Sequence, residues 1–226
     1  TPDSYTFLTN DTRFGAPVCL MVLRGPPPGP RLEWQLGILY GLQHENLARL
    51  HQSFRLEDAT PVLVTERAGG NTLLELLQLR PLALSDGLFI LDQMLAGLEV
   101  CHAHGVIHRD LRPGNVRVQP RLGGGVGRVK VLAVGLAQLL SDRAAPIVGD
   151  RLYGHPQFTA PEQWVNRQVD ARTDIYAVGL LGFALLRGRN FIQSGEPLDV
   201  CTQHFRAPRP LLTETAGGET IPATLA

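Results

Sequence analysis

The residues best suited to chemistry lie in one polar loop, between strand-like segments at 106–107 and 116–118. Asp110 carries a carboxylate that could accept a proton as a general base. Asn115 carries an amide oxygen, which is a ligand type that hard divalent cations accept. Because both side chains belong to one short loop, the loop is a candidate site for proton transfer beside a metal ion.

Two other sets of residues suggest metal or redox chemistry less strongly. His102, His104 and His108 are close in sequence, but side chains two residues apart at the end of a helix do not face one point. Three cysteines lie far apart without a CxxC pair, which argues against a disulfide framework or a zinc site built from cysteine. We therefore expect no bound metal, and the cysteines fit a reducing compartment.

The segment 108–115, HRDLRPGN, closely resembles the HRDLxPxN catalytic loop of eukaryotic-type protein kinases. Further landmarks of that family follow in order, since 160–162 resembles the APE motif and 174–179 resembles the start of the central helix of the C-lobe. Segments 44–47 and 63–66 resemble the HPNI motif and the strand that enters the hinge. The resemblance covers essentially the whole chain and is closest to bacterial Ser/Thr kinases of the PknB-like type.

At three positions the residue that the resemblance implies is absent. Met21 stands where a kinase has the lysine that holds the α/β-phosphates, Gln35 where it has the glutamate that holds this lysine, and Ala133 where it has the magnesium-binding aspartate. The joint loss favours a catalytically inactive pseudokinase, with Asp110 and Asn115 retained for the structure of the loop.

The resemblance also assigns an adenine pocket and a set of structural residues. Cys19, Thr65, Arg67 and Arg117 are its adenine-pocket equivalents, and a guanidinium at 117 could not be buried under a base without a carboxylate partner. We therefore expect neither ATP nor magnesium to bind. The residues with implied structural roles are His108, Arg109, Glu162 and Asp174, the last of which should bond the backbone of the catalytic loop.

The activation segment also departs from the resemblance. His155 replaces the threonine of a GTPxY motif, and no Ser or Thr lies between Ser141 and Gly154. Regulation by phosphorylation of this segment is therefore not expected.

The chain has 21 basic residues, of which Lys130 is the single lysine. Some kinases move the phosphate lysine to a neighbouring strand, and Lys130 is the candidate for such a change. Two alternatives to the inactive scaffold thus stay open: a weakly active or unconventional Ser/Thr kinase that uses Asp110 with Lys130 or an arginine, and a nucleotide sensor that needs no metal.

Apolar patterning predicts a β-rich part followed by an α-rich part. The expected strands are 5–8, 18–23, 47–54 and 61–65; the expected helices are 31–42, 72–79, 86–104 and 174–186; and a proline-rich linker covers 25–30. We expect an α+β bilobal kinase-like fold, with an N-lobe over 1–66 and a C-lobe over 67–226. Most of the glycine-rich loop, the first strand and the last helices of the family pattern would lie outside this chain.

Composition excludes only broad classes of protein. The 21 acidic residues balance the 21 basic ones, and 19% of residues are charged while 44% are hydrophobic, as in an ordinary soluble globular chain. The longest apolar stretch, 175–186, is too short for a membrane span. The expected function is therefore a cytoplasmic scaffold or allosteric regulator, not an enzyme, that binds a protein partner such as an active kinase and no nucleic acid.

Overall fold

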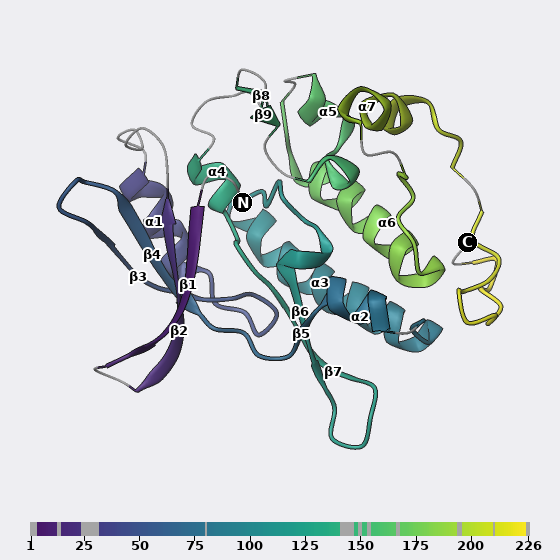
Figure 1. Ribbon diagram of the computed structural model, residues 1–226, viewed down its shortest axis with the longest axis horizontal. Helices are drawn as coiled ribbons and strands as arrows, with labels where there is room; N and C mark the ends of the chain where they lie inside the picture. Colours follow the sequence, from purple (N-terminus) through teal and green to yellow (C-terminus); the bar gives the residue numbers. More distant parts are fainter. Residues whose placement is uncertain are drawn as a thin grey trace.

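The computed structural model describes residues 4–12, 15–23, 32–79, 81–140, 147–148, 151–152, 155–165, 168–193, 196–209 and 211–224 (Figure 1). The predicted proline-rich linker at 25–30 lies outside these residues. So do Ser141 and Gly154, which bound the segment without a phosphate acceptor.

The N-terminal part is an antiparallel sheet with one helix beside it (Figure 1). Its strands are β1 (Ser4–Asp11), β2 (Ala16–Leu23), β3 (Leu50–Arg55) and β4 (Pro61–Glu66), in the order β1-β2-β4-β3. Helix α1 (Leu32–Gly41) buries Leu32, Leu36 and Leu39, which share one face at helical spacing.

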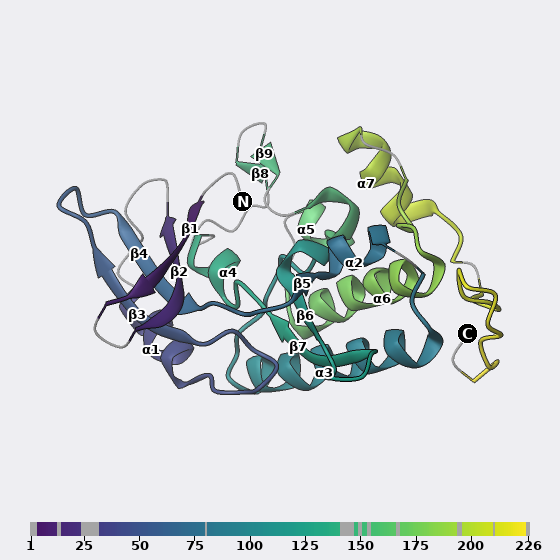
Figure 2. The same ribbon diagram turned by 60° about the horizontal axis from the view of Figure 1, so that its bottom comes forward.

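The C-terminal part is built on two long helices, α3 (Leu84–Ala103) and α6 (Ala171–Arg187). Figure 2 shows the hairpin of β6 (Val116–Pro120) and β7 (Val126–Val131) lying along α3. The remaining elements are β5 (Asn71–Thr72), α2 (Leu73–Leu79), η1 (Pro113–Asn115), α4 (Leu136–Leu140), β8 (Ile147–Val148), β9 (Arg151–Leu152), η2 (Pro156–Phe158), α5 (Pro161–Trp164) and α7 (Pro197–Arg206).

Helix α6 is the centre of the C-terminal part because it is apolar on nearly all sides. The side chain of Asp170 accepts a hydrogen bond from the backbone N–H of Arg172 and caps the first turn. Gly188, with φ 64°, ends the helix in the left-handed conformation that glycine adopts at low cost. The cap at Asp170 places the start of α6 at Ala171, three residues before the predicted start at position 174.

The two parts meet where the chain between α1 and β3 pairs with β7. The N–H of Val131 donates to the carbonyl of Asn46 at 2.8 Å, and the N–H of Ala48 donates to the carbonyl of Val131 at 2.8 Å. Leu47 is 2% exposed between them and belongs to a hydrophobic core that includes residues of both parts. The predicted strand at 47–54 therefore begins only at Leu50.

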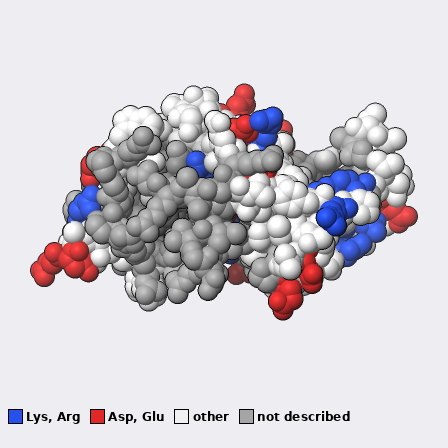
Figure 3. Space-filling view, turned by 90° about the horizontal axis from the view of Figure 1, so that it is seen from above, with Lys and Arg blue, Asp and Glu red and all other residues white. Residues whose placement is uncertain are grey.

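The predicted α+β two-part architecture is confirmed, with corrections to single elements. Helix α7 occupies a region for which no helix was predicted, and α3 starts at Leu84 rather than at position 86. Among the described residues, none of the helices combines the length and apolar character needed to cross a bilayer. Figure 3 shows that basic groups on the face seen from above lie mainly over the helical part.

Candidate active site

The loop at 108–115 is held by the carboxylate of Asp174, which is fully buried in α6. Its oxygens accept the backbone N–H groups of His108 and Arg109, each at 2.9 Å, and the ring nitrogen Nε2 of His102 at 2.7 Å. Arg109 has φ 64°, an unusual conformation for a residue with a side chain, which these bonds help to fix. Burial lowers the pKa of Arg109, whereas the Asp174 carboxylate raises it.

The three histidines of the region point to separate partners. His108 is fully buried and donates from Nε2 to the carbonyl of Leu132 at 2.7 Å, so its Nδ1 accepts the N–H of Asp110 at 3.3 Å. His104 bonds the carbonyl of Val100 at 2.8 Å. In the part of the chain that the structure describes, no three His, Cys, Asp or Glu side chains are grouped to hold a metal ion.

Asp110 and Asn115 lie together in the folded loop. Asn115 Nδ2 donates to the carbonyl of Asp110 at 2.8 Å and to its carboxylate oxygen Oδ2 at 2.9 Å. Arg112 Nε lies 3.5 Å from the same Oδ2. The other oxygen, Oδ1, is buried and makes no hydrogen bond to any residue that the structure describes. Since a buried carboxylate oxygen without a donor is costly, Oδ1 is an acceptor suited to a hydroxyl of a bound molecule.

The activation segment reaches this loop through two side chains. Gln163 Nε2, in α5, donates to the carbonyl of Arg109 at 3.0 Å. Two charged groups of the loop, Arg112 and Asp110, act on the pKa of His155. Burial and the Arg112 guanidinium lower this pKa, whereas the Asp110 carboxylate raises it. An imidazole that interacts electrostatically with this carboxylate therefore stands where the sequence pattern has a threonine.

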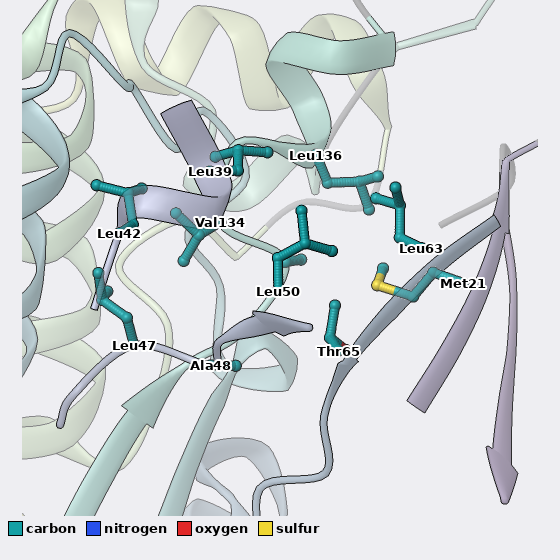
Figure 4. Close-up of a pocket in the computed structure, with 11 residues that line it drawn as sticks. Met21, Leu39, Leu42, Leu47, Ala48, Leu50, Leu63, Thr65, Val134 and Leu136 are labelled. Atoms are coloured by element: carbon teal, nitrogen blue, oxygen red, sulfur yellow. The ribbon is translucent and has the colours of Figure 1, made fainter. Parts of the chain in front are cut away.

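Met21 lines a small apolar pocket between the two parts (Figure 4). In the sheet, Met21 is opposite Leu63 of β4. The residues that line the pocket are Met21, Leu39, Leu42, Leu47, Ala48, Leu50, Leu63, Thr65, Ala133, Val134 and Leu136. None of these lining residues has a charged side chain. The pocket therefore offers no ammonium group that a phosphate could contact, and Met21 does not replace the missing lysine.

Gln35 of α1 and Ala133, which lies between β7 and α4, both have side chains without an ionisable group. Gln35, on α1, is half-buried and lines a second small pocket with Gly135 and Leu139. Ala133 has φ 56° and offers no side-chain oxygen. Neither residue fits the glutamate or aspartate contact that the family pattern has at these positions.

The adenine-pocket equivalents come together around the paired residues Cys19 and Thr65 of β2 and β4. Burial raises the pKa of Cys19, while the guanidinium groups of Arg117 and Arg67 lower it, so both arginines lie near this thiol. Arg117 Nη1 donates to the carbonyl of Gly70 at 2.9 Å. Among the described residues, this guanidinium thus has a backbone carbonyl rather than a carboxylate as its hydrogen-bond partner.

Lys130 lies on β7, a different strand from β2, which carries Met21. Its Nζ is 2.6 Å from Glu66 Oε2 and donates to the carbonyl of Leu47 at 3.1 Å. From the sequence, Lys130 was considered only as a replacement for the phosphate lysine. Its partners Glu66 and Leu47 were not predicted, because they lie 64 and 83 residues away in the chain.

Glu162 accepts a hydrogen bond from Thr173 Oγ1 at 2.6 Å, which joins α5 to the start of α6. The bond between His102 and Asp174 was also missed by sequence reasoning. The sequence alone does not predict this bond, because the bond depends on how α3 packs against α6.

Comparison with known proteins gives a consistent group of similarities. The family described as protein kinase domain matches residues 33–217. The chain is 34% identical over 171 residues to the serine/threonine-protein kinase Pkn1 of Myxococcus xanthus, which covers 74% of this chain and 24% of that protein. It is 29% identical over 213 residues to the serine/threonine-protein kinase PknA of Mycobacterium tuberculosis, with 89% of this chain and 48% of that protein covered.

A further relative is the probable serine/threonine-protein kinase PknB of Lactococcus lactis, which is 30% identical over 170 residues and covers 75% of this chain and 26% of that protein. The chain therefore spans between about a quarter and about half of the length of these relatives.

These similarities correct two expectations. The relatives are named serine/threonine-protein kinases, which are enzymes, so the expectation that the chain is not an enzyme is wrong. Kinases of this kind transfer phosphate from ATP with magnesium. The expectation that no cofactor binds is therefore also wrong. The expectation arose because Met21, Arg117 and Ala133 were given more importance than the retained catalytic-loop motif at 108–115.

Proposed function

The chain belongs to the protein kinase family, and on that premise we propose that it is the kinase domain of an unconventional serine/threonine kinase. Its lobes would be residues 1–66 and 67–226. The observation that carries the proposal is Asp110, whose Oδ1 is buried and lacks a hydrogen-bond donor among the described residues. A serine or threonine hydroxyl of a protein substrate is the donor that this oxygen fits.

Asp110 acts as the base for this hydroxyl. The substrate O–H bond would break as its proton moves to Oδ1, while the hydroxyl oxygen forms a bond to the γ-phosphorus of ATP. The bond between that phosphorus and the oxygen it shares with the β-phosphate would break at the same time, so that ADP leaves. Asn115 and Arg112 hold the second carboxylate oxygen, Oδ2, and so aim Oδ1 at the substrate. Asp174 fixes the loop backbone through the N–H groups of His108 and Arg109.

The departures at three positions predict slow transfer. Met21 and Ala133 provide neither the ammonium nor the carboxylate that usually hold the phosphates and the metal, and Gln35 provides no partner for an ammonium. The retained base and asparagine lower the barrier by positioning and proton transfer alone, so turnover well below that of ordinary kinases is expected.

Transfer to an array of serine- and threonine-containing peptides tests the proposal. With γ-labelled ATP, the wild-type chain should label a subset of peptides slowly, and Asp110→Asn should reduce the rate by about 100-fold or more, in the range of general-base loss. Asp92→Asn is the matched control, because it makes the same chemical change at an exposed residue of α3. Equal rates for wild type and Asp110→Asn would rule out Asp110 as the base.

Regulation of another kinase through protein binding is a second candidate function. It is favoured by the apolar pocket around Met21, which lacks the charge needed for rapid turnover. Such a role should survive Asp110→Asn, so the activity of a purified partner kinase, measured with and without this variant, separates the two functions. The cytoplasmic location stays a prediction.

A further inference from the structure

The ε-amine of Lys130 joins three segments that are far apart in the sequence. From β7 it contacts the carboxylate of Glu66, the last residue of β4, at 2.6 Å, and the carbonyl of Leu47 at 3.1 Å. The side chain of Lys130 is 11% exposed and that of Glu66 is 32% exposed. Because the ammonium is largely shielded from water, its attraction to Glu66 is screened less than that of a pair on the open surface.

Glu66 is also tied to the segment that follows α1. Its Oε2 accepts the N–H of Arg49 at 3.3 Å, and its own N–H donates to the carbonyl of Arg49 at 2.8 Å. The adjoining residues Asn46 and Ala48 pair with the backbone of Val131 on β7. Lys130 therefore completes a closed set of contacts that runs from β7 to residues 46–49 and to the end of β4.

The connection between the two parts begins at Glu66 and is fixed again at Gly70. Gly70 has φ 82°, and a Cβ added there would lie 2.2 Å from the carbonyl oxygen of Val118 on β6. Arg117, also on β6, donates to the carbonyl of Gly70 at 2.9 Å. The hairpin β6–β7 thus holds both ends of this connection, and a connection held at both ends has little freedom to swing.

We infer that Lys130 is a positioning residue, which clamps the end of β4 and residues 46–49 onto β7 and thereby fixes the angle between the two parts of the molecule. The inference goes beyond the proposed transfer reaction and does not depend on it. It also gives the single lysine a role other than contact with phosphate, since two of its three N–H donors already point to Glu66 and Leu47.

Amine labelling tests the clamp directly because the chain has a single ε-amine. A water-soluble N-hydroxysuccinimide ester should modify Lys130 of the folded chain at least about 10-fold more slowly than the amine introduced by Arg172→Lys, a position whose side chain is 89% exposed. Glu66→Gln should raise the rate at Lys130 about fivefold or more. A wild-type rate equal to that of the Arg172→Lys amine would overturn the inference.

Distances between spin labels test the positioning role. One label is placed on Glu57→Cys, between β3 and β4, and one on Cys201 of α7, in a background with Cys19→Ser. Cys101 stays unlabelled, because it is fully buried and burial raises its pKa to about 12. Double electron–electron resonance should give one narrow distance distribution for this parent chain.

Lys130→Met should widen that distribution about twofold or shift its centre, and Lys130→Arg, which keeps the charge, should restore much of it. Arg172→Met is the control, because it removes an exposed ion pair within the C-terminal part. If Lys130→Met fails to fold, Glu66→Gln provides the same measurement. Loss of phosphate transfer in Lys130→Met with an unchanged distribution would assign Lys130 to phosphate contact and overturn the positioning role.

Discussion

At the scale of single residues, the site combines an intact base with neutral side chains at the positions that usually carry charge. Asp110 is held by Asn115 and Arg112, so the proton acceptor is organised before a substrate arrives. Ala133 has φ 56°, a left-handed conformation that aspartate and asparagine tolerate better than alanine does. The backbone at this position is therefore already suited to an aspartate.

Ala133→Asp should add a metal ligand at a backbone conformation that aspartate tolerates. We expect the variant to need at least about 10-fold less magnesium than wild type for ATP to raise the melting temperature, because binding to the folded state stabilises it. The measurement is a thermal-shift titration of magnesium at fixed ATP. Ala133→Asn is the control, since it shares the backbone preference but lacks the charge. Identical titrations for the three chains would show that position 133 does not face the bound phosphates.

What the sequence predicts at this scale depends on distance along the chain. Asp110, Asn115 and His108 were identified because all three belong to one motif of eight consecutive residues, 108–115. The partners of Lys130 were not identified, because Glu66 and Leu47 reach it only after the sheet, the segment after α1 and the hairpin have assembled. The same holds for His102, whose bond to Asp174 spans 72 residues.

At the scale of elements, a buried imidazole on α7 contacts two other elements of the C-terminal part. His204 donates from Nε2 to the carbonyl of Pro156 in η2 at 2.7 Å, so its Nδ1 accepts the hydroxyl of Tyr176 in α6 at 2.9 Å. The ring also lies 6.0 Å from the ring of Trp164 in α5, and Arg209 donates to the Tyr176 oxygen at 3.1 Å. A proton on Nδ1 would have to bond the Tyr176 hydroxyl oxygen, which already accepts a hydrogen bond from Arg209.

Burial and the nearby Arg209 guanidinium lower the pKa of His204, whereas its bond to the Pro156 carbonyl raises it. Folding therefore favours the neutral ring. As the pH falls below about 6.5, the unfolded chain takes up a proton that the folded chain resists, and stability is lost at up to about 1.4 kcal/mol per pH unit. Above that pH this contribution is flat.

Urea unfolding of wild type and His204→Gln between pH 8 and pH 5 measures this effect. Glutamine can bond Pro156 and Tyr176 without titrating, so the variant should lose less stability on acidification than wild type. His155, whose pKa burial also lowers, remains in both chains and cancels from the comparison. Parallel stability curves for the two chains would contradict the assignment to His204.

Element boundaries were less predictable than element types. Helices α3 and α6 were expected because long runs of apolar residues favour them, but their first residues depend on local caps such as Asp170. Helix α7 went unpredicted, although Pro197 at its first turn is a known start signal, because its sequence PLDVCTQHFR is only weakly apolar.

At the scale of the whole molecule, the two parts share one core. Buried residues of the sheet and α1, such as Leu39 and Leu63, belong to the same hydrophobic cluster as Leu98 and Leu181 of the long helices. Leu47 lies at the junction, and a Cβ added at Gly97 of α3 would come within 2.9 Å of its Cδ2. Such continuous packing, together with the Lys130 clamp, predicts that the parts unfold together.

Leu47→Ala tests this cooperativity. Removing a fully buried leucine should cost about 2–5 kcal/mol, and because the side chain packs against both parts, the melting transition should move to lower temperature without splitting. Differential scanning calorimetry, compared with helix and tertiary signals in circular dichroism, measures both properties. Leu122→Ala, at a fully exposed leucine in the β6–β7 turn, should leave the transition in place. Two separated transitions in Leu47→Ala would mean that the sheet and the helices are stable independently, and that the shared core couples them only weakly.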